Sequence, residues 1–73
     1  MILSLEVEKV DKFVIANIEH ELSDTTADLR HAAINAVLDA GYLFDGKSER
    51  ISGRGTYTTV SWQALDKLQA STQ

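Results

Sequence analysis

Residues 23–41 read SDTTADLRHAAINAVLDAG, and this stretch decides the fold because it carries both start and stop signals for a helix. Thr25 with Asp28 three residues later approximates a capping box, with Asp in place of the usual Glu. Gly41 can adopt the left-handed conformation that ends a helix. Apolar residues form one stripe, widened by Ile34 and Leu38: Leu29, Ala33, Ala36, Val37 and Ala40. The pattern predicts an amphipathic helix between Thr25 and Gly41.

Two segments before this helix alternate between apolar and polar residues. In residues 2–9, one predicted face carries Leu3, Leu5 and Val7. In residues 13–22, one predicted face carries Val14, Ala16 and Ile18. This alternation has the period of half-buried strands, and the short break at Asp11-Lys12 predicts a hairpin. A helix is the alternative for residues 10–22, where apolar residues also recur every four positions; the abundance of Val, Ile and Phe favours strands.

Glycines punctuate the chain after the helix. We expect a loop over residues 45–48 and a second hairpin whose strands, 49–51 and 56–60, flank a turn at 52–55. Ser61 is predicted to cap a closing helix, with Val60 and Leu65 at hydrophobic-staple spacing. The buried stripe of that helix would be Trp62, Leu65 and Leu68. The predicted fold is α+β, in the order ββαββα: an antiparallel four-stranded sheet with two helices packed on one face.

Length and composition narrow the class of protein. The 73 residues predict one small domain spanning 1–73. Apolar residues make up 44% and charged residues 25% of the chain, values typical of folded proteins. Cysteine is absent, which excludes disulfides and thiolate metal sites, and we expect neither a metal nor a cofactor. The first residues lack a basic region and no apolar run has the length of a membrane span, so a cytoplasmic location without membrane contact is expected.

Residues 41–48 match the phosphate-loop pattern G-x-x-x-x-G-K-[ST] letter for letter. The chemistry of that pattern requires a strand before the loop and a helix after it, so that backbone amides face the phosphates. Here a helix precedes the stretch, and residues 49–53 show no helical pattern. We interpret the match as coincidence, which leaves nucleotide handling at Gly46-Lys47-Ser48 as the weakest hypothesis.

Residues suited to catalysis are scattered. Asp28 and His31 lie one helical turn apart, but both fall off the apolar stripe and are interpreted as solvent-exposed. His20 is interpreted as a strand residue between two glutamates. No nucleophile elbow or related signature occurs. We therefore predict no catalytic residues and no enzymatic activity.

Charge is distributed unevenly along the chain. Residues 1–45 contain nine acidic and three basic residues, whereas residues 46–73 contain two acidic and four basic residues. Candidate contacts to a partner or to nucleic acid come from the basic hairpin 47–54 and the tyrosine that follows it: Lys47, Arg50, Arg54 and Tyr57.

Two functional hypotheses follow. The first is a non-enzymatic protein–protein interaction module whose partner is another protein, including a second copy of itself, because strands starting at Ile2 leave sheet edges open. The alternative is a small nucleic-acid-binding regulator that uses the hairpin 47–54. The chain is acidic overall and that hairpin carries three basic residues, so its charge favours the first hypothesis.

One resemblance concerns the second half of the chain. The run from Asp24 to Gln69, with a helix, a hairpin and a last helix initiated by Ser61, resembles small phage head–tail joining proteins, although their architecture lacks the first hairpin. It shares no diagnostic residue with them. The resemblance implies only that a phage or mobile-element origin would suit the chain.

Overall fold

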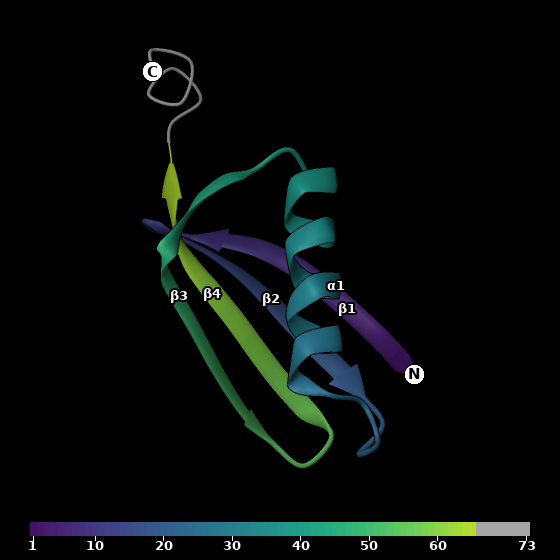
Figure 1. Ribbon diagram of the computed structural model, residues 1–73. Coiled ribbons are helices and arrows are strands. Elements are labelled where there is room, and N and C mark those ends of the chain that lie inside the picture. The colour runs from purple at the N-terminus through teal and green to yellow at the C-terminus, as the bar shows by residue number, and fades with distance from the viewer. Residues whose placement is uncertain (66–73) are drawn as a thin grey trace.

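A computed structural model describes residues 1–65 of the chain as one antiparallel sheet and one helix (Figure 1). The elements follow the order ββαββ: β1 Ile2–Val10, β2 Phe13–His20, α1 Thr26–Asp39, β3 Leu43–Arg54 and β4 Tyr57–Leu65. In space the strands lie in the order β1-β2-β4-β3, so β1 and β3 form the two edges. Helix α1 lies across one face of the sheet (Figure 1). No helix within these residues has the length and apolar character to cross a membrane.

The predicted closing helix is wrong, because Ser61 and Trp62 lie within strand β4. β4 occupies the centre of the sheet and pairs with β2 on one side and β3 on the other, which satisfies its backbone on both sides. Trp62 lies opposite Val14 of β2 and is fully buried. Leu68 lies outside the described residues. The α+β class and the four-stranded antiparallel sheet are confirmed, but the resemblance to head–tail joining proteins loses the last helix on which it depended.

The first hairpin is confirmed, and the helical alternative for residues 10–22 is wrong. Val10 pairs with Phe13 across the two-residue turn, where Asp11 takes a φ of 56°. Aspartate tolerates this left-handed region better than most residues, which explains a tight turn without glycine. The predicted inward position of Leu3 is wrong. A register shift between Ile2 and Ser4 leaves Leu3 58% exposed.

The second hairpin differs from its prediction in two places. β3 continues to Arg54, so the turn lies at Gly55-Thr56 instead of 52–55. The predicted loop at 45–48 is instead a bulge inside β3, where the register with β4 shifts between Asp45 and Arg50. Hydrogen bonds to side chains replace the backbone hydrogen bonds that β3 and β4 lose at the bulge. Asp45 Oδ1 accepts from the Lys47 amide at 3.0 Å, and Ser48 Oγ accepts from the Gln63 amide at 2.6 Å. Ser48 Oγ also donates to the Asp45 carbonyl at 2.7 Å.

The core lies between α1 and the sheet. Thr25 caps the helix as predicted, its side chain accepting from the Asp28 amide, and Gly41 follows with a φ of 89°. The buried stripe of α1 is shorter than predicted, and Leu38 is 50% exposed. The fully or almost fully buried apolar residues are Val14, Ala16, Ile18, Leu29, Ala33, Val37, Val60 and Trp62.

Two polar contacts adjoin the core between α1 and the sheet. Glu49, in the β3 bulge, accepts from the indole Nε1 of Trp62 at 3.0 Å and from Nε of Arg30 on α1 at 2.6 Å. At the other end of the sheet, His20 Nε2 lies 2.7 Å from Thr58 Oγ1. Within residues 1–65, no buried side-chain nitrogen or oxygen lacks a hydrogen-bond partner.

The start of β1 is joined to the segment before α1. The ammonium group of Met1 donates to Asp24 Oδ1. This hydrogen bond is the main reason that the pKa of the Met1 ammonium is raised and that of the Asp24 carboxyl is lowered. The ammonium group is exposed, so the contact positions the strand end more than it stabilises the fold.

Gly53 is required by a close approach between β3 and β4. A Cβ at this position would lie 2.6 Å from Thr58 Oγ1 and 3.0 Å from the Tyr57 carbonyl oxygen. Thr58 cannot rotate away without breaking its contact with His20. We expect Gly53→Ala to lower the free energy of unfolding by about 1–3 kcal/mol, measured by urea denaturation. Gly46→Ala is the matched control, because nothing lies within 4 Å of its Cβ position, and it should leave stability unchanged or slightly raised. Equal effects of the two substitutions would contradict this account.

Glu49 should matter chiefly as the acceptor for Trp62. Glu49→Ala leaves the buried indole N–H without a partner, so we expect a loss of about 1–3 kcal/mol in the free energy of unfolding. Glu49→Gln keeps an acceptor and loses only the ion pair with the half-exposed Arg30, which is worth about 0–1 kcal/mol. Urea denaturation of both variants, beside Arg30→Ala, gives the comparison. If Glu49→Gln lowers the free energy of unfolding as much as Glu49→Ala, then the charge of Glu49, and not its hydrogen bond to Trp62, stabilises the fold.

Candidate interaction surface

The sheet face opposite α1, called here the open face, is not covered by any element within residues 1–65. Side chains alternate between the two faces of a strand, so the pairing register shows which residues share this face. Four rows cross the sheet from β1 to β3: Val10, Phe13, Gln63 and Asp45; Glu8, Ile15, Ser61 and Arg50; Glu6, Asn17, Thr59 and Ser52; Ser4, Glu19, Tyr57 and Arg54.

Charge on the open face is divided between the two sides of the sheet. The side formed by β1 and β2 carries Glu6, Glu8 and Glu19. The opposite side, β3, carries Arg50 and Arg54, neither of which takes part in an ion pair within residues 1–65. Asp45 is also on β3, where its carboxylate accepts from the Lys47 amide. The face therefore presents an acidic strip on β1 and β2 and a basic strip on β3, separated by β4.

Apart from Ile15, the middle of the open face is polar, and its side chains are held in place by hydrogen bonds. Thr59 on β4 donates to Asn17 Oδ1 on β2 at 3.0 Å, and Asn17 Nδ2 donates to Glu8 Oε2 on β1 at 3.0 Å. This chain of contacts crosses three strands. It fixes the side chains before any partner binds, which lowers the entropy lost on association.

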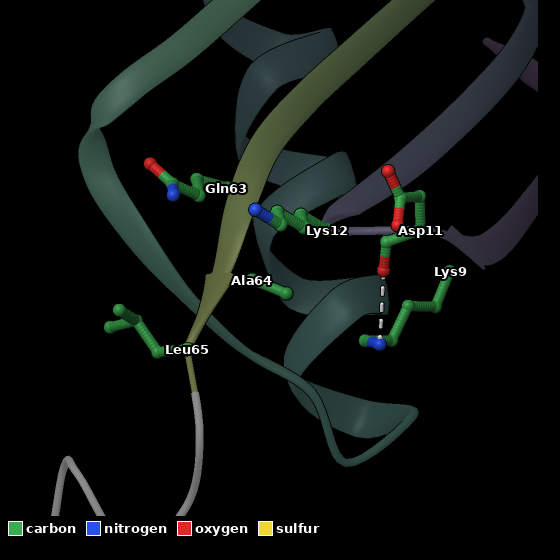
Figure 2. A pocket seen from close by; sticks show the side chains of 6 residues that line it. All are labelled: Lys9, Asp11, Lys12, Gln63, Ala64 and Leu65. Atoms are coloured by element: carbon green, nitrogen blue, oxygen red, sulfur yellow. Dashed lines mark hydrogen bonds between the residues drawn. The ribbon is translucent and has the colours of Figure 1, made fainter.

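Apolar residues gather at the end of the open face next to the first turn. Val10, Phe13 and Leu65 are 48%, 49% and 36% exposed. Figure 2 shows Gln63 and Leu65 projecting to one side of β4, whereas Ala64 projects to the other. The residues in this view line a shallow hollow beside the turn, which the 2.8 Å hydrogen bond from the Ala64 amide to the Lys12 carbonyl joins to β4.

Three of the four residues predicted as contacts lie together on the open face. Arg54 and Tyr57 are direct cross-strand partners, and Arg50 lies on the same side of β3. Lys47 lies in the β3 bulge, apart from the tip of the hairpin. A second hollow lies beside the bulge and connects it to the open face. It is lined by Lys47 and Arg50 together with Phe13, Ser61 and Gln63.

The residues weighed for catalysis are not brought together. Asp28 and His31 are exposed on α1, on the other side of the sheet from the open face. His20 is confirmed as a strand residue and is buried against Thr58. The phosphate-loop match ends inside β3, so no helix begins at Lys47. Within residues 1–65, no three His, Cys, Asp or Glu side chains are placed to hold a metal ion.

Sequence reasoning missed the division of the open face into an acidic and a basic side, and the contact between Glu49 and Trp62. The acidic side is visible in the sequence, since Glu6 and Glu8 alternate with apolar residues. The strand order that places this side across the sheet from β3 is not marked by any local pattern. The sequence predicts Glu49 only as part of a strand next to a loop, and no local pattern marks it as the acceptor for a distant tryptophan.

Comparisons with protein-family models, curated proteins and solved structures found no match to this chain.

Proposed function

We propose that the chain is a non-enzymatic interaction module that binds another protein through the open face of its sheet. The observation that carries the proposal is the arrangement of that face, where an acidic and a basic strip flank a hydrogen-bonded centre and no element of residues 1–65 covers it. A face with separated charges selects partners by electrostatic complementarity and orients them on approach.

The exposed side chains on this face are of the types that contribute most to protein interfaces. Tyr57 is 56% exposed, Phe13 is 49% exposed, and Arg54 is the cross-strand partner of Tyr57. Aromatic residues and arginine are enriched in interfaces and among the residues that dominate binding energy. The partner that fits is a protein surface with basic groups opposite β1 and acidic groups opposite β3.

Nucleic-acid binding is the second candidate, and the side-by-side placement of Arg54 and Tyr57 favours it. A base can stack on an exposed tyrosine while a guanidinium contacts phosphate. The same face, however, carries Glu6, Glu8 and Glu19 along its other side, and these carboxylates repel a phosphate backbone. With only two arginines on the face, the electrostatic gain is small, so the protein partner is preferred.

Capture from a lysate of the source cells tests the proposal. The immobilised chain should retain a specific protein, and Tyr57→Ala or Arg54→Ala should weaken the affinity of the identified partner by roughly tenfold or more, as expected for interface residues of these types. Isothermal titration with the purified partner gives the affinities.

His31→Ala and Asn35→Ala serve as controls, because both residues are exposed on α1 and lie away from the open face. Equal weakening by the controls, or no effect of the open-face variants, would overturn the proposal. A mobility-shift titration at low salt separates the second candidate. Retardation of single- or double-stranded nucleic acid that disappears in Arg50→Ala with Arg54→Ala would replace the protein partner with nucleic acid.

A further inference from the structure

The two edges of the sheet present free backbone groups at defined residues. The two-residue turns make Val10 with Phe13, and Arg54 with Tyr57, hydrogen-bonded pairs, so even-numbered residues of β1 and β3 bond inward. The hydrogen bonds from the Ala64 amide to the Lys12 carbonyl and from the His20 amide to the Thr56 carbonyl fit the same alternation. The outward-facing amides and carbonyls therefore belong to Leu5, Val7 and Lys9 on β1 and to Ile51 and Gly53 on β3.

The direction of the strands makes these two edges compatible with each other. All neighbouring strands are antiparallel, so with four strands in the sheet β1 and β3 run in opposite directions. A second copy in the same orientation would place its β1 antiparallel to β3 of the first. The helices of both copies would then lie on the same side of one continuous sheet.

Side chains on the two edges are complementary in this arrangement. β1 carries Glu6 and Glu8 on the open face, and β3 carries Arg50 and Arg54. On the other face, Ile51 is 39% exposed and would meet Val7, which is only partly buried. Opposite charges and apolar residues directly across a strand pair both stabilise the pair.

We propose that the β3 edge of one copy pairs with the β1 edge of a second copy, with Ile51 opposite Val7 and Arg50 opposite Glu8. This inference rests on the proposed interaction role and names one partner for it, a second copy of the chain. The outward groups of Ile51 and Val7 form a hydrogen-bonded pair in this register, as do those of Gly53 and Leu5. The bulge between Asp45 and Arg50 confines the contact to residues 50–54, so the assembly is weak and depends on concentration.

Pairing of like edges is disfavoured by the same charges. A two-fold β1 pair brings the carboxylates of Glu6 and Glu8 from two copies beside one another, and a two-fold β3 pair does the same with Arg50 and Arg54. Like charges across a strand pair are destabilising. Because the favoured contact joins two different edges, it repeats from copy to copy, and the product is a ring or a filament instead of a closed dimer.

A charge-exchange experiment tests the pairing. The native chain should show a sedimentation coefficient that rises with concentration and falls with added salt. Glu8→Arg alone and Arg50→Glu alone should each sediment as monomers, because each puts like charges together at every contact. An equimolar mixture of the two variants should assemble again, since each variant then supplies the edge that the other needs. A native chain that stays monomeric at millimolar concentration, or a mixture that stays monomeric, overturns the inference.

Engineered cysteines test the register. Cβ atoms directly opposite on neighbouring strands are about 4.5–5.5 Å apart, close enough for a disulfide after a small adjustment. The chain has no cysteine of its own. Under oxidation, Glu8→Cys with Arg50→Cys should give a ladder of covalent trimers and larger species, while Glu6→Cys with Arg50→Cys should give far less. The opposite order of yields would overturn the proposed register.

The two proposals fail in different ways. A strictly monomeric chain removes self-pairing but leaves open-face binding of another protein, which capture with Tyr57→Ala decides separately. Self-assembly that responds to the Glu8 and Arg50 exchange, without a captured protein sensitive to Tyr57→Ala, would leave the second copy as the partner and remove the open-face proposal.

Discussion

A single short helix can cover only one face of a four-stranded sheet, and the rest of the structure follows from this limit. A helix of the 14 residues in α1 is about 21 Å long, and four strands at about 4.8 Å spacing span about 14 Å between their outer axes. Leu29, Ala33 and Val37 of α1 are buried against the inner strands, where Trp62 is the largest fully buried side chain. Apolar residues are concentrated under the helix, so the opposite face has to be made soluble by polar and charged side chains.

The same limit explains why charged and polar groups take part in the core. Trp62 is fully buried, so its indole N–H needs an acceptor within the fold. The bulge in β3 places Glu49 beside Trp62 and within reach of Arg30 on α1. One carboxylate on β3 therefore accepts hydrogen bonds from a core residue and from the helix. Arg30 of α1 is therefore engaged in a structural contact.

Local sequence signals identified α1, the first hairpin and the presence of a second hairpin, but not the full extent of β3 and β4. Capping residues and alternation act over a few positions, and these are intact between Thr25 and Gly41. Ser61 followed by Trp62 carries two conflicting signals, since Leu65 lies at helical staple spacing while Thr58, Val60 and Trp62 alternate as in a strand. Pairing with β2 decides the conflict, because it places Ser61 and Trp62 opposite Ile15 and Val14, which lie far earlier in the chain and which no local pattern records. For the same reason Arg50, Arg54 and Tyr57 could be nominated as contacts, but their position across the sheet from Glu6, Glu8 and Glu19 could not be predicted.

The order of strands converts an uneven charge distribution along the chain into an uneven distribution in space. β1 contributes the first edge, and the connection through α1 carries the chain past the position of β4 to the other edge, where β3 lies. Acidic residues dominate before the helix, and three of the four basic residues that follow position 45 lie on β3. Had β3 paired with β2 instead, Arg50 and Arg54 would be interior strand residues near Glu19, and their charges would be partly neutralised within the sheet. With β4 between them, a strand rich in serine and threonine keeps the acidic and basic strips apart, and both remain available to groups outside the fold.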